Sequence, residues 1–290
     1  MTAPEPGTGS NPTTDSAKDP QLARWQRFRN SRNAALASEH GWLTLTSFQW
    51  LEDRPSAVEL APGLWSTDGT AARLTAAVPE GLTLVETGEP VDGTVSAELA
   101  DEESLMWVQY GGDDGRQVVV ELAMRAGKYA IRTRDSQSPV FTGFDGVPTF
   151  DFRPDLVIEA RFVPYAEPVD VPIGTANPLV GGIHRSVGEL VFRLPGSEHE
   201  FRLQAEEEKL GALTVTFHDE TNGESTDEWR KVSTARPRVD AAGNRTVILD
   251  FNRAINYPSA FTPYGTCPMP VKNNSLDYRI TAGEKEPGLF

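Results

Sequence analysis

The chain has 290 residues, of which 42 are acidic and 27 are Lys or Arg, giving a formal net charge of -15. A charge of this sign would repel the phosphate backbone of a nucleic acid and an anionic membrane surface, so neither is expected as a partner. The single cysteine cannot form an intramolecular disulfide, and the N-terminus lacks the basic and apolar regions of a signal peptide. We therefore expect a cytoplasmic protein. No apolar run approaches the ~18 residues that cross a bilayer, so we also expect it to be soluble.

The N-terminal residues divide into an arm and a helix. Residues 1–18, MTAPEPGTGSNPTTDSAK, have too little apolar surface to offset the entropy of ordering, which predicts a disordered arm. A helix is expected from Pro20 to His40, with Asp19 as its N-cap and proline at its first position. Its apolar residues recur at near-helical spacing and predict an amphipathic helix: Leu22, Trp25, Phe28 and Leu36.

After this helix the pattern changes to short, β-branched segments, each a strand candidate. They are 73–78, 82–86, 104–110, 117–124, 128–134, 156–164, 189–194, 212–219, 245–251 and 276–282. Hairpin turns are indicated at Asp92-Gly93, Asp114-Gly115, Pro195-Gly196, Asn222-Gly223 and Gly243-Asn244. Because hairpins join antiparallel strands and no helical pattern separates the strands, we predict an all-β fold, mainly an antiparallel barrel or sandwich, with one N-terminal α-helix. Residues 19–290 are expected to form a single domain.

Residues 249–270, LDFNRAINYPSAFTPYGTCPMP, concentrate polar side chains on a backbone stiffened by prolines, which is more typical of a site than of a core. Arg253 presents a planar fork of donors that suits a carboxylate or a phosphate, and Asn252 beside it offers both a donor and an acceptor. We therefore expect a substrate-binding pocket that contains Asn252, Arg253 and Asn256.

Acid-base groups lie in the same part of the chain. Neighbouring residues of a strand point to opposite faces, and we expect Glu284 to face inward as a base and Lys285 outward. Tyr264 follows a proline and could serve as an acid, although it could equally be an aromatic lid. Arg253 could instead be an internal clamp that bridges to Asp250 or Glu284.

Residues 249–270 and the segment AGEK at 282–285 resemble the C-terminal signature of the bacterial family named domain of unknown function 1684. Three earlier segments are also similar to that family: GWLTLTSFQWL (41–51), FRPDLVIEARFVPY (152–165) and FHDETNGESTDEWR (217–230). The resemblance implies no particular reaction. Ser259 stands where the family usually carries a cysteine, so Cys267 has no partner for a metal pair or a redox couple. A reactive Cys267 would need a base beside it, and the alternative is a small buried side chain.

The sequence lacks the nucleophile elbow, the phosphate-binding loop, the dinucleotide fingerprint and the zinc-binding helix motif, so we expect neither a cofactor nor a metal. The leading hypothesis is a small-molecule enzyme that carries out hydrolysis, elimination or cyclisation on a polar or anionic substrate. In it Arg253 binds the anion, Glu284 is the base and Tyr264 the acid. The alternatives are a non-catalytic binding module and a structural or interaction protein. A buried Glu284 with a raised pKa would favour the enzyme, whereas a fully ion-paired Glu284 and Arg253 would favour binding or structure.

Overall fold

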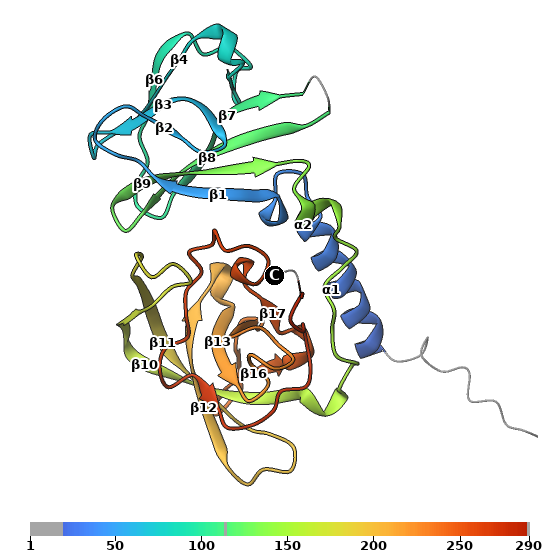
Figure 1. Cartoon of the computed structure of the whole chain (residues 1–290). Coiled ribbons are helices and arrows are strands. Elements are labelled where there is room, and N and C mark those ends of the chain that lie inside the picture. Colours follow the sequence, from blue (N-terminus) through green and yellow to red (C-terminus); the bar gives the residue numbers. More distant parts are fainter. Residues whose placement is uncertain (1–19, 113–114, 289–290) are drawn as a thin grey trace, which may run out of the picture.

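The computed structural model describes residues 20–112 and 115–288, and there the fold is mostly antiparallel β-sheet with one long helix, as predicted (Figure 1). The helix α1 (Pro20–Leu36) starts at the expected proline. It ends before His40, whose φ of 55° is left-handed and incompatible with a continuing helix. The predicted arm at 1–18 and the cap residue Asp19 lie outside the described residues. No described helix is long and apolar enough to cross a membrane.

The first β region forms a five-stranded sheet of order β1-β9-β8-β7-β5 and a four-stranded sheet of order β2-β3-β4-β6. Its strands are β1 (Leu45–Trp50), β2 (Ser56–Val58), β3 (Ala61–Thr67), β4 (Ala72–Ala76), β5 (Thr83–Leu84), β6 (Gly93–Ala97), β7 (Ser104–Gly111), β8 (Gln117–Arg125) and β9 (Lys128–Asp135). Its core contains Trp65 and Trp107, whose rings meet edge to face at 5.7 Å. Short helices flank the strands: η1 (Trp42–Thr44), η2 (Val78–Glu80) and α2 (Pro139–Thr142).

The second β region is a larger sheet of order β15-β16-β10-β11-β12-β13-β14-β17 that curls into a half-barrel (Figure 1). Its strands are β10 (Val157–Ile173), β11 (Gly182–Arg193), β12 (Glu200–Glu207), β13 (Leu213–Asp219), β14 (Arg230–Ser233), β15 (Arg238–Val239), β16 (Arg245–Asp250), β17 (Ile255–Asn256) and β18 (Ser275–Leu276). Its short helices are η3 (Pro154–Leu156), η4 (Lys209–Gly211), η5 (Phe251–Arg253) and η6 (Pro258–Ala260). This sheet has a separate apolar core, centred on residues such as Phe217 and Phe251. The expectation of one domain over 19–290 stays a prediction.

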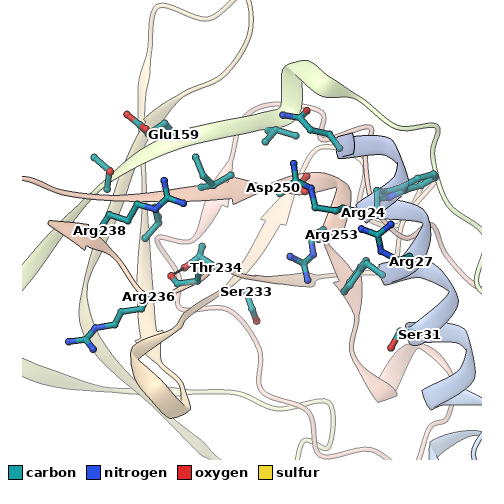
Figure 2. Close-up of a pocket in the computed structure, with 18 residues that line it drawn as sticks. Arg24, Arg27, Ser31, Glu159, Ser233, Thr234, Arg236, Arg238, Asp250 and Arg253 are labelled. Atoms are coloured by element: carbon teal, nitrogen blue, oxygen red, sulfur yellow. Dashed lines mark hydrogen bonds between the residues drawn. The ribbon is translucent and has the colours of Figure 1, made fainter. Parts of the chain in front are cut away.

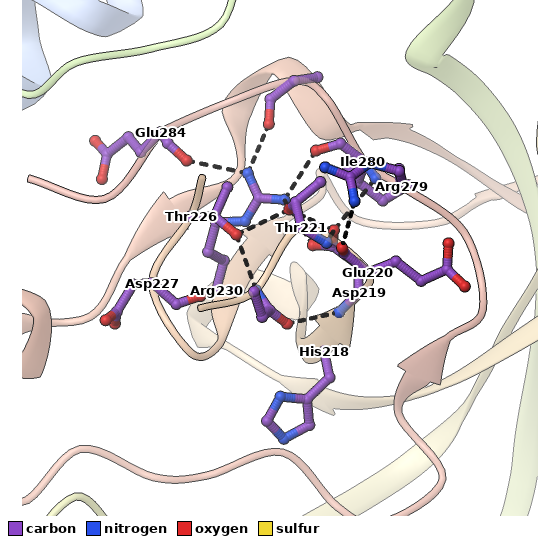
Figure 3. A network of polar contacts seen from close by, with 12 residues as sticks. His218, Asp219, Glu220, Thr221, Thr226, Asp227, Arg230, Arg279, Ile280 and Glu284 are labelled. Carbon is purple, nitrogen blue, oxygen red and sulfur yellow. Dashed lines mark hydrogen bonds and ion pairs between the residues drawn. The ribbon is translucent and has the colours of Figure 1, made fainter. Parts of the chain in front are cut away.

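The predicted strand at 276–282 is wrong beyond Leu276, where β18 ends. Two of its backbone carbonyls accept hydrogen bonds from a side chain instead of a neighbouring strand. Arg230, which is fully buried, donates to the carbonyl oxygens of Ile280 at 3.0 Å and Ala282 at 2.7 Å (Figure 3). The same guanidinium pairs with Asp219 at 2.7 Å. The alternating sequence pattern does not distinguish a segment that pairs with a neighbouring strand from one whose carbonyls are bound by a buried arginine.

A buried ion-pair group lies on β8 and β9. Glu121 accepts hydrogen bonds from Arg132 at 3.2 Å and from Arg134 at 2.8 and 2.5 Å, and all three side chains are buried. Both guanidiniums lie over the ring of Trp42, and Arg132 also reaches the hydroxyl of Thr266 at 3.3 Å. These contacts link the first β region to the segment that carries the candidate site residues.

We predict that Glu121→Gln will lower the free energy of unfolding by about 3–5 kcal/mol, because it leaves two buried guanidiniums without a carboxylate. Burial raises the pKa of Glu121, but the charges of Arg134 and Arg132 outweigh that effect and hold the pKa below its usual value. The difference in the free energy of unfolding between wild type and Glu121→Gln should therefore be largest at neutral pH and should shrink as the pH falls through this lowered pKa. Urea denaturation at several pH values measures it.

The control for this measurement is Asp170→Asn, which breaks the surface pair with Arg185 at 2.9 Å, where both side chains are more than half exposed. That variant should unfold almost as the wild type does. An equal loss in the two variants would show that the buried position of Glu121 contributes nothing.

Cys267 is 7% exposed and packs with Trp229 and Tyr257. Burial raises the pKa of its thiol, which keeps it protonated at neutral pH. We predict slow reaction of Cys267 with a thiol reagent in the folded protein and fast reaction in denaturant, followed by absorbance of the released chromophore. Equal rates in the two states would contradict burial.

Candidate functional site

A groove of about 760 Å³ lies between α1 and the outer face of the second β region (Figure 2). The alternation of β16 creates its floor: Val247 and Leu249 point into the core, whereas Thr246, Ile248 and Asp250 face outward. The residues between β14 and β15 close one end, and α1 forms the opposite wall.

Arginine side chains line this groove from three parts of the chain. They are Arg24 and Arg27 on α1, Arg236 in the connection before β15, Arg238 at the start of β15, and Arg253 on η5 (Figure 2). None of them forms an ion pair with a carboxylate among the residues that the structure describes. The groove also contains the carboxylates of Glu159 and Asp250. The arginines therefore outnumber the acids here, although acids predominate in the chain as a whole.

Arg253 is exposed in the groove, and its guanidinium carbon lies 4.5 Å from the ring centre of Phe28 on α1. This stacking holds the planar group while leaving its donors available to a ligand. Within the described residues Arg253 pairs with neither Asp250 nor Glu284. The side chain of Asp250 instead accepts hydrogen bonds from Asn252. The clamp that the sequence suggested as an alternative is thus not formed by these pairs.

Asn252 is 1% exposed and serves the backbone around the groove. Its side chain accepts from the N–H of Arg153 at 2.7 Å and donates to the carbonyl of the same residue at 2.8 Å. Its own carbonyl accepts the indole N–H of Trp25 at 3.0 Å. Asn252 therefore joins α1, η5 and the residues before β10, and its amide is not presented to the groove.

Glu284 lies apart from the groove and is completely buried. One carboxylate oxygen accepts from Arg29 at 3.0 Å and Arg32 at 3.1 Å, and the other accepts from the backbone N–H of Asn256 at 2.7 Å. Arg29 also donates to the carbonyl of Val147 at 2.6 Å. Both carboxylate oxygens are therefore engaged by the helix and by β17.

The two remaining predicted residues, Asn256 and Tyr264, also lie outside the groove. The side-chain amide of Asn256 donates to the carbonyl of Lys285 at 2.8 Å, which ties β17 to the C-terminal segment. Tyr264 is half-buried in the turn where its N–H meets the hydroxyl of Thr262, and it does not line the groove. Of the five residues suggested by the sequence, the structure brings only Arg253 to the groove.

The two arginines of α1 that hold Glu284 were missed by the sequence analysis. The inward side of the helix contains Trp25, Arg29, Arg32 and Leu36, so that two basic residues occupy positions of the apolar stripe. That interruption is the available sequence signal. It indicates that a carboxylate lies opposite the helix, but not which one.

We predict that Glu284→Gln will lower the free energy of unfolding by about 3–5 kcal/mol, because it leaves Arg29 and Arg32 facing a neutral amide in a buried position. Glu286→Gln, at an exposed position two residues further on, is the matched control and should cost little. Urea denaturation followed by circular dichroism compares them. Equal stability of Glu284→Gln and wild type would contradict the anchoring role.

Comparison with known proteins gives a family but no activity. No curated protein matches the chain. The solution NMR structure of an uncharacterised protein from Haloarcula marismortui is 28% identical, covering 50% of this chain and 78% of its own, with a TM-score of 0.40. Residues 142–285 match the family described as "Protein of unknown function (DUF1684)", a range that begins after the first β region and includes β10 to β18 and Glu284. Through these residues the chain belongs to that family, as its sequence resemblance indicated.

Proposed function

We propose that the groove between α1 and β16 binds a small organic anion. The observation that carries this proposal is the concentration, in one groove of a strongly acidic protein, of guanidiniums that have no carboxylate partner among the described residues. An acidic chain has many carboxylates with which surface arginines can pair. Arginines that line one groove without such partners provide positive charge and N–H donors suited to a carboxylate or a phosphate.

The arrangement of the arginines favours a ligand held from several sides. Arg24 and Arg27 project from α1, Arg253 from η5, and Arg236 and Arg238 from the opposite end of the groove (Figure 2). These arginines belong to separate elements of the fold, so the position of each guanidinium does not depend on contacts with the other arginines. A ligand with one anionic group would engage some of them, and the others would raise the local potential and its rate of association.

The floor of the groove indicates that the ligand also has an apolar part. Ile248 is 45% exposed there, and Val157 and Phe28 lie alongside it. Covering this surface removes apolar area from water, which contributes favourably to binding. The class of ligand we propose is therefore an aryl or alkyl carboxylate or phosphate ester. A cytoplasmic location is part of this proposal.

Acid-base catalysis is a second proposal, and the carboxylates inside the groove support it better than Glu284 does. Glu159 and Asp250 line the same groove as the arginines, so either could accept a proton from a bound anion or from a water molecule. The engagement of both Glu284 oxygens by Arg29, Arg32 and the N–H of Asn256 favours an anchor over a base. Hydrolysis of a bound ester is the reaction to test first.

Phenyl phosphate is a suitable probe, since it has one anionic group and one apolar ring. We predict saturable binding by isothermal titration calorimetry and at least about tenfold weaker binding to Arg253→Lys, which keeps the charge but loses the planar fork. The melting temperature should stay within a few degrees of the wild type, because Arg253 is exposed. Arg54→Lys changes an arginine that is 86% exposed outside the groove, and should bind as the wild type does.

Phenol, which has the ring without the charge, should bind far more weakly than phenyl phosphate. Unchanged affinity in Arg253→Lys, or equal binding of phenol, would overturn the proposed anion site. Release of phenol from phenyl phosphate that is lost in Glu159→Gln or Asp250→Asn, with binding retained, would support the catalytic proposal. Binding without release by the wild type would leave the groove as a binding site for this ester.

A further inference from the structure

A second cavity, of about 470 Å³, has the opposite charge to the arginine groove. It lies between the connection from β13 to β14 and the proline-rich segment around η6. The carboxylates of Asp227, Glu228 and Glu286 line it, and no arginine or lysine does. None of these three carboxylates forms an ion pair among the described residues. The cavity is therefore an uncompensated negative site.

The buried indole of Trp229 provides an independent sign of a ligand. Trp229 lines the cavity, is 4% exposed, and its Nε1–H has no hydrogen-bond partner in the described structure. A buried donor without an acceptor is unfavourable, so such groups in folded proteins normally meet a partner. Ser259 also lines the cavity, and its side chain interacts with the thiol of Cys267. A ligand with an oxygen acceptor would satisfy the indole N–H of Trp229.

The lining favours an organic cation over a metal ion. No three His, Cys, Asp or Glu side chains in residues 20–112 and 115–288 are grouped closely enough to hold a metal. The walls also contain apolar surface from Met269, Pro263 and Ala176, which suits carbon groups on a ligand. Tryptophan is the side chain whose ring attracts a cation most strongly.

The electrostatic state of Asp227 is consistent with a missing positive charge. Burial raises the pKa of its carboxyl, and the neighbouring carboxylates of Glu228 and Glu286 raise it further. A bound cation would relieve both effects, since an opposite charge nearby favours the ionised form. Figure 3 shows Asp227 on the side of the polar network away from Glu220, an exposed acid outside the cavity.

We propose that this cavity binds a small organic ammonium ion that carries a hydroxyl or carbonyl oxygen, of the amino-alcohol class. The carboxylates of Asp227, Glu228 and Glu286 attract the ammonium group, and the indole ring of Trp229 faces its carbon substituents. The oxygen of the ligand accepts the indole N–H. This site is separate from the arginine groove, because no residue lines both cavities.

Choline and tetramethylammonium test the proposal, since they share the quaternary charge and only choline has a hydroxyl. Titration calorimetry on the full chain should detect saturable binding of choline, and tetramethylammonium should bind about threefold or more weakly. Asp227→Asn should weaken both ions by about tenfold. Glu220→Gln removes one negative charge outside the cavity and should change neither affinity.

Trp229→Phe keeps an aromatic ring but removes the N–H, so it should abolish the preference for choline over tetramethylammonium. If this variant does not fold, Glu286→Gln takes its place and should weaken the binding of both ions, as Asp227→Asn does. Arg253→Lys should leave choline binding unchanged, which separates this site from the arginine groove. Absence of saturable choline binding, equal effects of Asp227→Asn and Glu220→Gln, or displacement of choline by calcium chloride would each overturn the proposal.

Discussion

The carboxylate of Glu284 is the contact on which the arrangement of the second β region and its groove depends. It is enclosed by Arg29 and Arg32, which lie 255 and 252 residues away in the chain. A buried carboxylate without these partners would be strongly unfavourable, and so would the guanidiniums without it. The pairing therefore fixes the rotation and the height of α1 against the sheet. The shape of the groove depends on this contact, because α1 forms one of the walls of the groove.

Arginine has two distinct uses in this protein. Inside it, every buried cluster has its carboxylate: Arg29 and Arg32 with Glu284, Arg132 and Arg134 with Glu121, and Arg230 with Asp219. These groups join segments that are distant in sequence, and their hydrogen-bond geometry permits few alternative packings. In the groove the arginines have no carboxylate partners among the described residues. The contrast separates structural cations from those available to a ligand, which residue type alone does not do.

The sequence predicts the fold class well because periodicity is a local property. The change from helical spacing to β-branched runs locates α1 and strands such as β8 and β9 within a few residues. Several strands of the second β region were not predicted. Of these, β14 is only four residues long, and β12 was missed although its apolar residues alternate with polar ones. The segment 276–282 has the pattern of a strand, but its carbonyls bind Arg230. A contact with a residue about 50 positions away in the chain leaves no pattern in the local sequence.

The residues of the candidate site also differ in whether the local sequence reveals their role. Arg253 is recognisable because its residue type, its position after a strand and its proline-rich surroundings are all local. The surroundings of Glu284 are not, since its partners come from the other end of the chain. Asn252 and Asn256 have the composition of a site, yet their amides bond to backbone groups. A high density of polar residues in a sequence therefore identifies a segment whose side chains form many specific hydrogen bonds. It does not tell whether those bonds are made to a ligand or to the protein backbone.

The separation between α1 and Glu284 has a consequence for how the protein is made. The 17-residue helix has arginines within its inward stripe, and most of the stability of a helix in a protein comes from its tertiary packing. Its arginines leave the ribosome before the two β regions do, and Glu284 follows only after both β regions have been synthesised. The helix therefore docks late, and its docking requires the closing of a very long loop. Until then the arginines of α1 carry their charge in solvent, and the groove has only one of its walls.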